Sequence, residues 1–84
     1  MKYIVKEFIA ATGAPWNQAV VLSVEPRHVD HQIARQHVRA MRDGEQVISC
    51  QVYDDKLSAR AAANMVNQAF DTKLKAWNKL MAHV

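Results

Sequence analysis

The sequence predicts an α+β fold: a small antiparallel sheet with two helices on one face, in the order β-β-α-β-α. Three observations support this prediction. Two segments alternate with the period of a strand, the last third repeats apolar residues with the period of a helix, and glycine or proline falls between these segments. Because 84 residues have room for one hydrophobic core, we expect residues 1–84 to form a single domain.

The first two elements are predicted to be strands. Residues 3–11 are mostly β-branched, aromatic or small, and residues 12–15 follow them with the composition of a turn. Residues 20–24 alternate with a period of two, which is typical of a strand with one face on the core. Pro26 ends this strand, because proline has no N–H to donate to a neighbouring strand.

Residues 27–43 admit two interpretations, of which we favour a helix. Pro26 stands where a helix accepts its first residue, and Gly44 stands where a helix accepts a left-handed C-terminal cap. The alternative makes residues 36–41 a strand that pairs with residues 46–52 across a tight turn at Gly44. The fold would then be a four-stranded meander followed by one long C-terminal helix, β-β-β-β-α. In the helix, one half of the wheel is expected to face the core: Val29, Ile33, Ala34, His37, Val38, Ala40 and Met41.

Residues 46–53 are predicted to be a strand under either interpretation. Ile48, Cys50 and Val52 alternate with the residues between them, so we expect these three side chains on the buried face. Asp54 and Asp55 follow the strand and suit the start of a helix, because a carboxylate there can accept a hydrogen bond from a free N–H of the first turn.

Residues 57–84 are predicted to be helical, with apolar side chains over about half of the circumference. A continuous helix of this length would span about 42 Å, whereas a compact domain of this size is only about 30 Å across. The helix therefore either breaks, with Asp71 as the expected position, or its end projects. A projecting end would expose Trp77, Leu80 and Met81, side chains suited to a protein contact.

Patterns that would indicate catalysis or metal binding are weak. His28, His31 and His37 are close in sequence, but on a helix His37 points away from the other two, so the three cannot converge on one metal ion. Cys50 is expected on the buried face, where a thiol behaves as a small hydrophobe. We therefore expect no catalytic residues, no metal and no cofactor.

Arg35 and Arg39 form the clearest binding pattern. They lie four residues apart and share one face of a helix, and Arg42 and His31 extend the same patch. Four arginines and one aspartate give residues 27–42 a net charge of +3, while the segment that follows is acidic. Guanidinium groups bind carboxylate and phosphate through paired hydrogen bonds. The patch therefore predicts contact with an acidic protein surface or a nucleic-acid backbone, unless it is a solvated charged face.

These observations favour a small non-enzymatic binding protein, a regulator or inhibitor that acts through contacts with a larger protein partner. The first alternative is a nucleic-acid-binding module that uses the arginine patch, although a net charge of +3 would neutralise few phosphates. The second is a homodimeric structural or accessory protein, joined where two last helices pack at Trp77. A single cysteine favours the reducing cytoplasm, and we expect no contact with a membrane.

Overall fold

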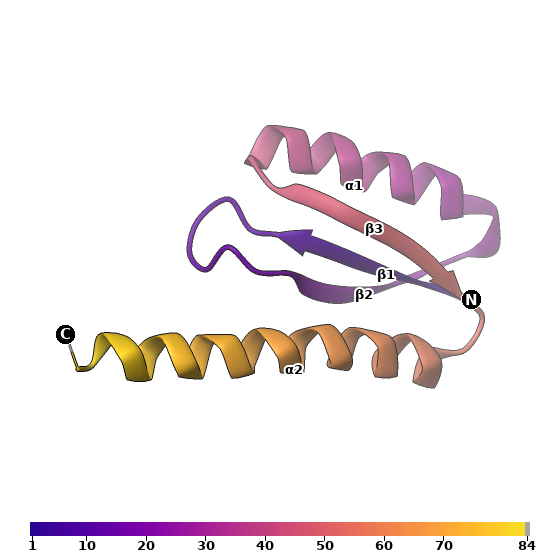
Figure 1. Cartoon of the computed structure of the whole chain (residues 1–84). Coiled ribbons are helices and arrows are strands. Elements are labelled where there is room, and N and C mark those ends of the chain that lie inside the picture. The colour runs from indigo at the N-terminus through magenta and orange to yellow at the C-terminus, as the bar shows by residue number, and fades with distance from the viewer. Residues whose placement is uncertain (84) are drawn as a thin grey trace.

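The computed structural model describes residues 1–83 and has three layers, with a sheet between two helices (Figure 1). The α+β class and the element order β-β-α-β-α are confirmed. One turn of 3-10 helix, Pro26–His28, precedes the first α-helix. In chain order the other elements are strand β1 Lys2–Ile9, strand β2 Gln18–Val24, helix α1 Val29–Asp43, strand β3 Gln46–Tyr53 and helix α2 Lys56–Met81.

The sheet has the strand order β2-β1-β3, and both outer strands run antiparallel to β1. Val5 of β1 lies opposite Val21 of β2 and Gln51 of β3. The register of β3 shifts near its start, where Ile48 is an extra residue that forms a β-bulge. β1 is therefore the central strand, and β2 and β3 are the two edges of the sheet.

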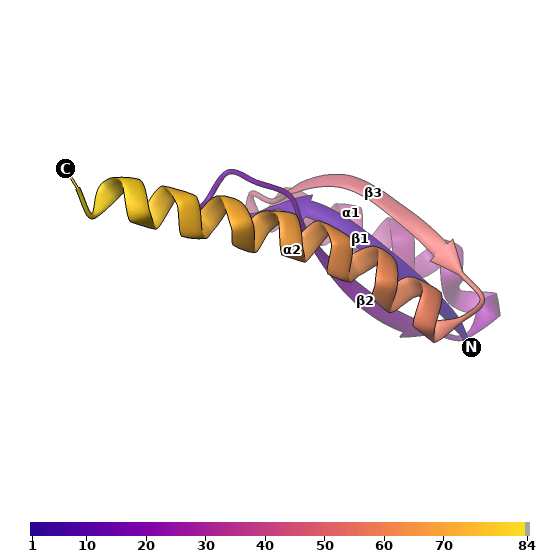
Figure 2. The same cartoon turned by 60° about the horizontal axis from the view of Figure 1, so that its bottom comes forward.

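The helices lie on opposite faces of this sheet, so the prediction that both share one face is wrong (Figure 1, Figure 2). Successive residues of a strand point to opposite faces, and the adjacent residues Ile4 and Val5 of β1 are both buried. Val5 belongs to the core beneath α2, whereas Lys6 contacts Gln36 of α1. A central strand that is apolar at adjacent positions needs cover on both faces, and one helix supplies each.

The core between the sheet and α2 is built from small residues. Ala59 and Ala63 of α2 are buried against Val5 and Ala19 of the sheet. Alanine at these positions lets the helix approach the strands closely. Two turns after Ala59, the side chain of Asn67 accepts a hydrogen bond from the Ala19 N–H and donates one to the Ala19 carbonyl, each at 2.9 Å. These bonds fix α2 beside β2.

The face of the sheet toward α1 buries an ion pair. Lys6 Nζ lies 2.5 Å from Glu45 Oε1 and 3.3 Å from Gln36 Oε1. The same ammonium group sits 5.1 Å from the centre of the Phe8 ring. The charge is therefore compensated by a carboxylate, an amide and an aromatic face, as a buried charge requires.

Residues 27–43 are helical apart from the 3-10 turn, so the helix interpretation is confirmed and the four-stranded meander is wrong. α1 ends at Gly44, whose φ of 75° is the predicted left-handed cap, and the Gly44 N–H bonds to the Ala40 carbonyl. Pro26 begins the 3-10 turn. Gly44 therefore caps the helix as predicted, whereas Pro26 begins the 3-10 turn that precedes α1 and not α1 itself.

α2 is continuous from Lys56 to Met81, so of the two alternatives the break at Asp71 is wrong and the projecting end is confirmed (Figure 2). Thr72, which follows the expected break, donates its hydroxyl to the Gln68 carbonyl within α2. The molecule is elongated, 52 × 30 × 13 Å with a radius of gyration of 14.6 Å, where a compact domain of this length would have about 12 Å. The C-terminal turns of α2 project past the end of the sheet, as Figure 2 shows. Val84 lies outside the described residues.

Candidate functional site

The outer side of α1, turned away from the sheet, carries the predicted binding residues. His31, Arg35, Arg39 and Arg42 are all exposed there. A shallow hollow on this side is lined by Arg35, Val38, Arg39 and Arg42. A second hollow continues it toward the start of the helix and is lined by His31, Ala34, Arg35 and Val38. The structure thus brings the four predicted side chains onto one surface.

Apolar side chains share this surface, which the sequence analysis did not anticipate. Val38 is 67% exposed and Met41 is 84% exposed, and Ala34 is exposed beside them. All three were expected in the core, and that expectation is wrong. The side of α1 that meets the sheet is narrower than half the wheel and is buried at Gln36 and Ala40. We call the seven residues of the outer surface the α1 outer face: His31, Ala34, Arg35, Val38, Arg39, Met41 and Arg42.

The charge of the α1 outer face is partly compensated at one end. Asp43 lies 3.8 Å from Arg39 and 3.5 Å from Arg42, at the C-terminal end of the helix. Within residues 1–83, no carboxylate lies within 4.0 Å of the Arg35 guanidinium. Exposed pairs such as those of Asp43 contribute little and exchange readily with water. Arg35 is therefore the cation of this face that is most available to a partner.

The projecting end of α2 is a second exposed apolar surface. Trp77, Leu80 and Met81 are each at least half exposed, as expected for an end that extends beyond the sheet. Lys73 is exposed on the same side of the helix as Trp77, and Lys75 and Lys79 are exposed on the opposite side. This end of the molecule is therefore both apolar and basic, like the α1 outer face.

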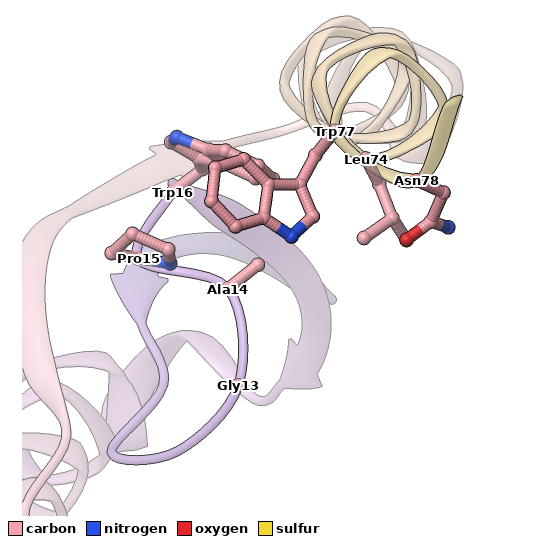
Figure 3. A pocket seen from close by; sticks show the side chains of 7 residues that line it. All are labelled: Gly13, Ala14, Pro15, Trp16, Leu74, Trp77 and Asn78. Carbon is pink, nitrogen blue, oxygen red and sulfur yellow. The ribbon is translucent and has the colours of Figure 1, made fainter. Parts of the chain in front are cut away.

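The loop between β1 and β2 supports part of this projecting helix. Trp16 packs edge-on against Phe70 and Trp77, with ring centres 6.1 Å and 6.5 Å apart. Beside these rings is a hollow of about 390 Å³, lined by Gly13, Ala14, Pro15, Trp16, Leu74, Trp77 and Asn78 (Figure 3). Trp16 lies between the two strands predicted at residues 3–11 and 20–24, and no packing role was predicted for it. Its large apolar ring in a turn-like segment was the available signal that this loop packs on something.

Cys50 lies on the face of the sheet toward α1 and is half-buried. Its neighbours Ile48 and Val52 are exposed, so the expectation that all three are buried is wrong. The pKa of the Cys50 thiol is raised because burial disfavours the thiolate, an effect that the positive charge of Lys6 partly opposes. A raised pKa makes a thiol a poor nucleophile at neutral pH.

The histidines do not form a cluster with other potential ligands. Across residues 1–83, no group of three or more His, Cys, Asp or Glu side chains is placed to hold a metal ion.

No helix of this part of the chain combines the length and hydrophobicity needed to cross a membrane. Comparisons with family models, with curated proteins and with solved structures find no match to this chain.

Proposed function

We propose that this protein is a small non-enzymatic binding protein that regulates or inhibits a larger protein partner by holding an acidic surface of that partner against the α1 outer face. One observation carries the proposal: Val38 and Met41 are exposed among the arginines instead of being packed in the core. A surface that combines apolar anchors with guanidinium groups has the composition of a protein interface, in which arginine and methionine are enriched.

Nucleic acid is the alternative occupant of the same face. A nucleic-acid backbone presents phosphates, which pair with arginine but gain little from an exposed valine or methionine. Bases could cover apolar side chains by stacking, but stacking platforms are usually aromatic, and the α1 outer face has only His31 as a ring. The apolar residues therefore favour a protein partner.

The projecting end of α2 suits the same class of partner. Trp77 supplies a large aromatic anchor, and Lys73, exposed one turn earlier on the same side of the helix, would favour an acidic surface. The homodimer in which two last helices pack at Trp77, Leu80 and Met81 stays a prediction. Lys73 weighs against it, because two copies packed on this side of the helix would bring like charges together.

The first test is charge reversal on the α1 outer face. Arg35→Glu with Arg39→Glu is expected to abolish capture of the partner from nuclease-treated cell extract, at a cost to folding below about 0.5 kcal/mol because both sites are exposed. The matched control is Lys56→Glu with Arg60→Glu on α2, which has the same spacing, exposure and change of charge. Unchanged capture by the first variant, or equal loss in both variants, would contradict the proposal.

The second test separates the two partner classes without changing any charge. Val38→Gln with Met41→Gln removes the apolar anchors and keeps every arginine. A protein partner should bind at least about tenfold more weakly, whereas a nucleic acid should bind with nearly the same affinity and lose affinity steeply as salt increases. Retained binding together with steep salt dependence would replace the protein partner with nucleic acid.

A further inference from the structure

The two edges of the sheet, β2 and β3, differ in whether another part of the chain hydrogen-bonds their outward backbone groups. At the β2 edge, Asn67 of α2 bonds both the N–H and the carbonyl of Ala19, as a neighbouring strand would. Within residues 1–83, no side chain makes an equivalent pair of bonds to β3. An edge strand with free backbone groups is a template for pairing with another strand.

The bonds to Ala19 also show which residues of β3 direct their backbone groups outward. Ala19 lies opposite Glu7, and because its own groups point away from β1, those of Glu7 point toward β3. Glu7 lies opposite Ser49, so the groups of Ser49 point inward. Antiparallel strands alternate, so the backbone groups of Cys50 and Val52 point outward.

β3 also lacks the usual protection of an edge strand. Residues 46–53 contain no charged residue and no proline, and the one irregularity is the bulge at Ile48. After the bulge, residues 49–53 pair regularly with β1. Val52 is 44% exposed on the face toward α1, so an apolar side chain borders the open edge.

We propose that residues 49–53 pair antiparallel with the same residues of a second copy of this chain, about a twofold axis at Gln51. This register places the outward backbone groups of Cys50 opposite those of Val52 in the second copy, and about four hydrogen bonds form in the two symmetric pairs. The twofold axis is perpendicular to the sheet. The dimer therefore has one continuous sheet, with both α1 helices on one face and both α2 helices on the other.

Charge favours a second copy at this edge over the other exposed surfaces. The α1 outer face and the end of α2 are basic, so two copies would repel each other there. β3 carries no charge, and its pairing with an identical strand brings no like charges into register. Pairing also buries Val52, which the monomer leaves partly in water.

The first experiment places a lysine on each edge in turn and measures the dissociation constant by sedimentation velocity up to high micromolar concentration. Val52→Lys should weaken the dimer by more than about tenfold. Val20→Lys is the matched control, because Val20 is 42% exposed on the same face of the sheet but lies on β2. It should leave the dissociation constant within about twofold of wild type. Circular dichroism must show that both variants are folded.

The second experiment traps the register with cysteines and uses the wild-type thiol. Wild-type chain is mixed with a Cys50→Ser, Val52→Cys variant and oxidised with copper phenanthroline at mildly alkaline pH. Facing residues of a hydrogen-bonded pair have Cα atoms about 5.5 Å apart, within the range of a disulfide. The mixture should therefore form a mixed disulfide dimer. Each chain alone should form far less disulfide, because the cysteines of two identical copies are offset by two residues and do not face each other.

Four outcomes would overturn the proposal. They are a wild-type chain that stays monomeric at high micromolar concentration, a dimer that Val52→Lys leaves intact, a dimer that Val20→Lys weakens equally, and equal trapping in the mixture and in each chain alone. A dimer that is dissociated by Trp77→Lys but not by Val52→Lys would assign self-association to the end of α2 instead. None of these measurements involves the acidic partner, so the proposal stands or fails separately from the proposed function.

Discussion

α1 and α2 cover opposite faces of one sheet by different means. α2 meets the strands with alanines, because Ala59 and Ala63 are buried in the apolar core with Val5 and Ala19. α1 meets the strands with Gln36 and Ala40, beside the ion pair of Lys6 and Glu45. α2 therefore buries small apolar residues and leaves larger ones exposed, at Leu57 and Met65 as well as at its projecting end. α1 contacts a buried charge and leaves Val38 and Met41 in water. The comparison shows that an amphipathic pattern identifies a helix without identifying which of its apolar residues are buried.

The largest expected effect is at the ion pair beneath α1. Glu45→Ala removes the carboxylate from Lys6, which is buried and would keep only Gln36 as a polar partner. An uncompensated buried charge is costly, so the free energy of unfolding should fall by about 3 kcal/mol, measured by urea denaturation.

The control replaces both charges. Lys6→Met combined with Glu45→Ala removes the ammonium group as well and should recover a large part of the loss, since an apolar side chain of similar length needs no partner. If the double variant is no more stable than Glu45→Ala alone, Lys6 is not the source of the cost. α1 and α2 would then differ only in how they pack on the sheet, and not in the burial of a charge.

The next effect in size is on the α2 side. Ala59 is fully buried between α2 and the sheet, so Ala59→Leu should force the helix away from the strands and destabilise the fold by about 2 kcal/mol. Ala34→Leu makes the same change on the exposed side of α1 and should stay within about 0.5 kcal/mol of wild type. Equal effects in urea denaturation would mean that the cost of Ala59→Leu does not come from overpacking between α2 and the sheet.

Much of this fold was predictable from local patterns. The period of two in residues 20–24 and 46–53 identified two strands, and Gly44 identified the end of α1, because both signals act through neighbouring residues. The placement of the helices was not predicted. It depends on β1 being apolar at Ile4 and Val5, a pattern that indicates cover on both faces and was treated only as a strand signal.

The candidate site was predicted in part for the same reason. Arg35 and Arg39 are four residues apart in a helix, so their position on one face follows from their spacing in the sequence. Val38 and Met41 are exposed because α1 turns Gln36 and Ala40 toward the sheet instead, and the partner that Gln36 contacts there, Lys6, is distant in sequence. A helical wheel contains no information about such a residue, so the apolar half of the surface could not be predicted.

The smallest expected effect is at the start of α2, where the N-cap Asp55 accepts hydrogen bonds from the Ser58 N–H at 3.0 Å and the Ser58 hydroxyl at 2.9 Å. These two bonds favour the charged form and lower the pKa of the Asp55 carboxyl below its ordinary value. Because the folded-state pKa is lower than the unfolded one, the stabilisation is complete above about pH 4 and is lost as the pH falls through the folded-state pKa.

Asp55→Ala should therefore lower the melting temperature at pH 7 and have a smaller effect near pH 2. Asp54→Ala, which removes the exposed ion pair with Lys2 but no cap, is the control and should change the melting temperature less at pH 7. A loss for Asp55→Ala that is the same at both pH values would mean that the cap acts through backbone geometry and not through its charge.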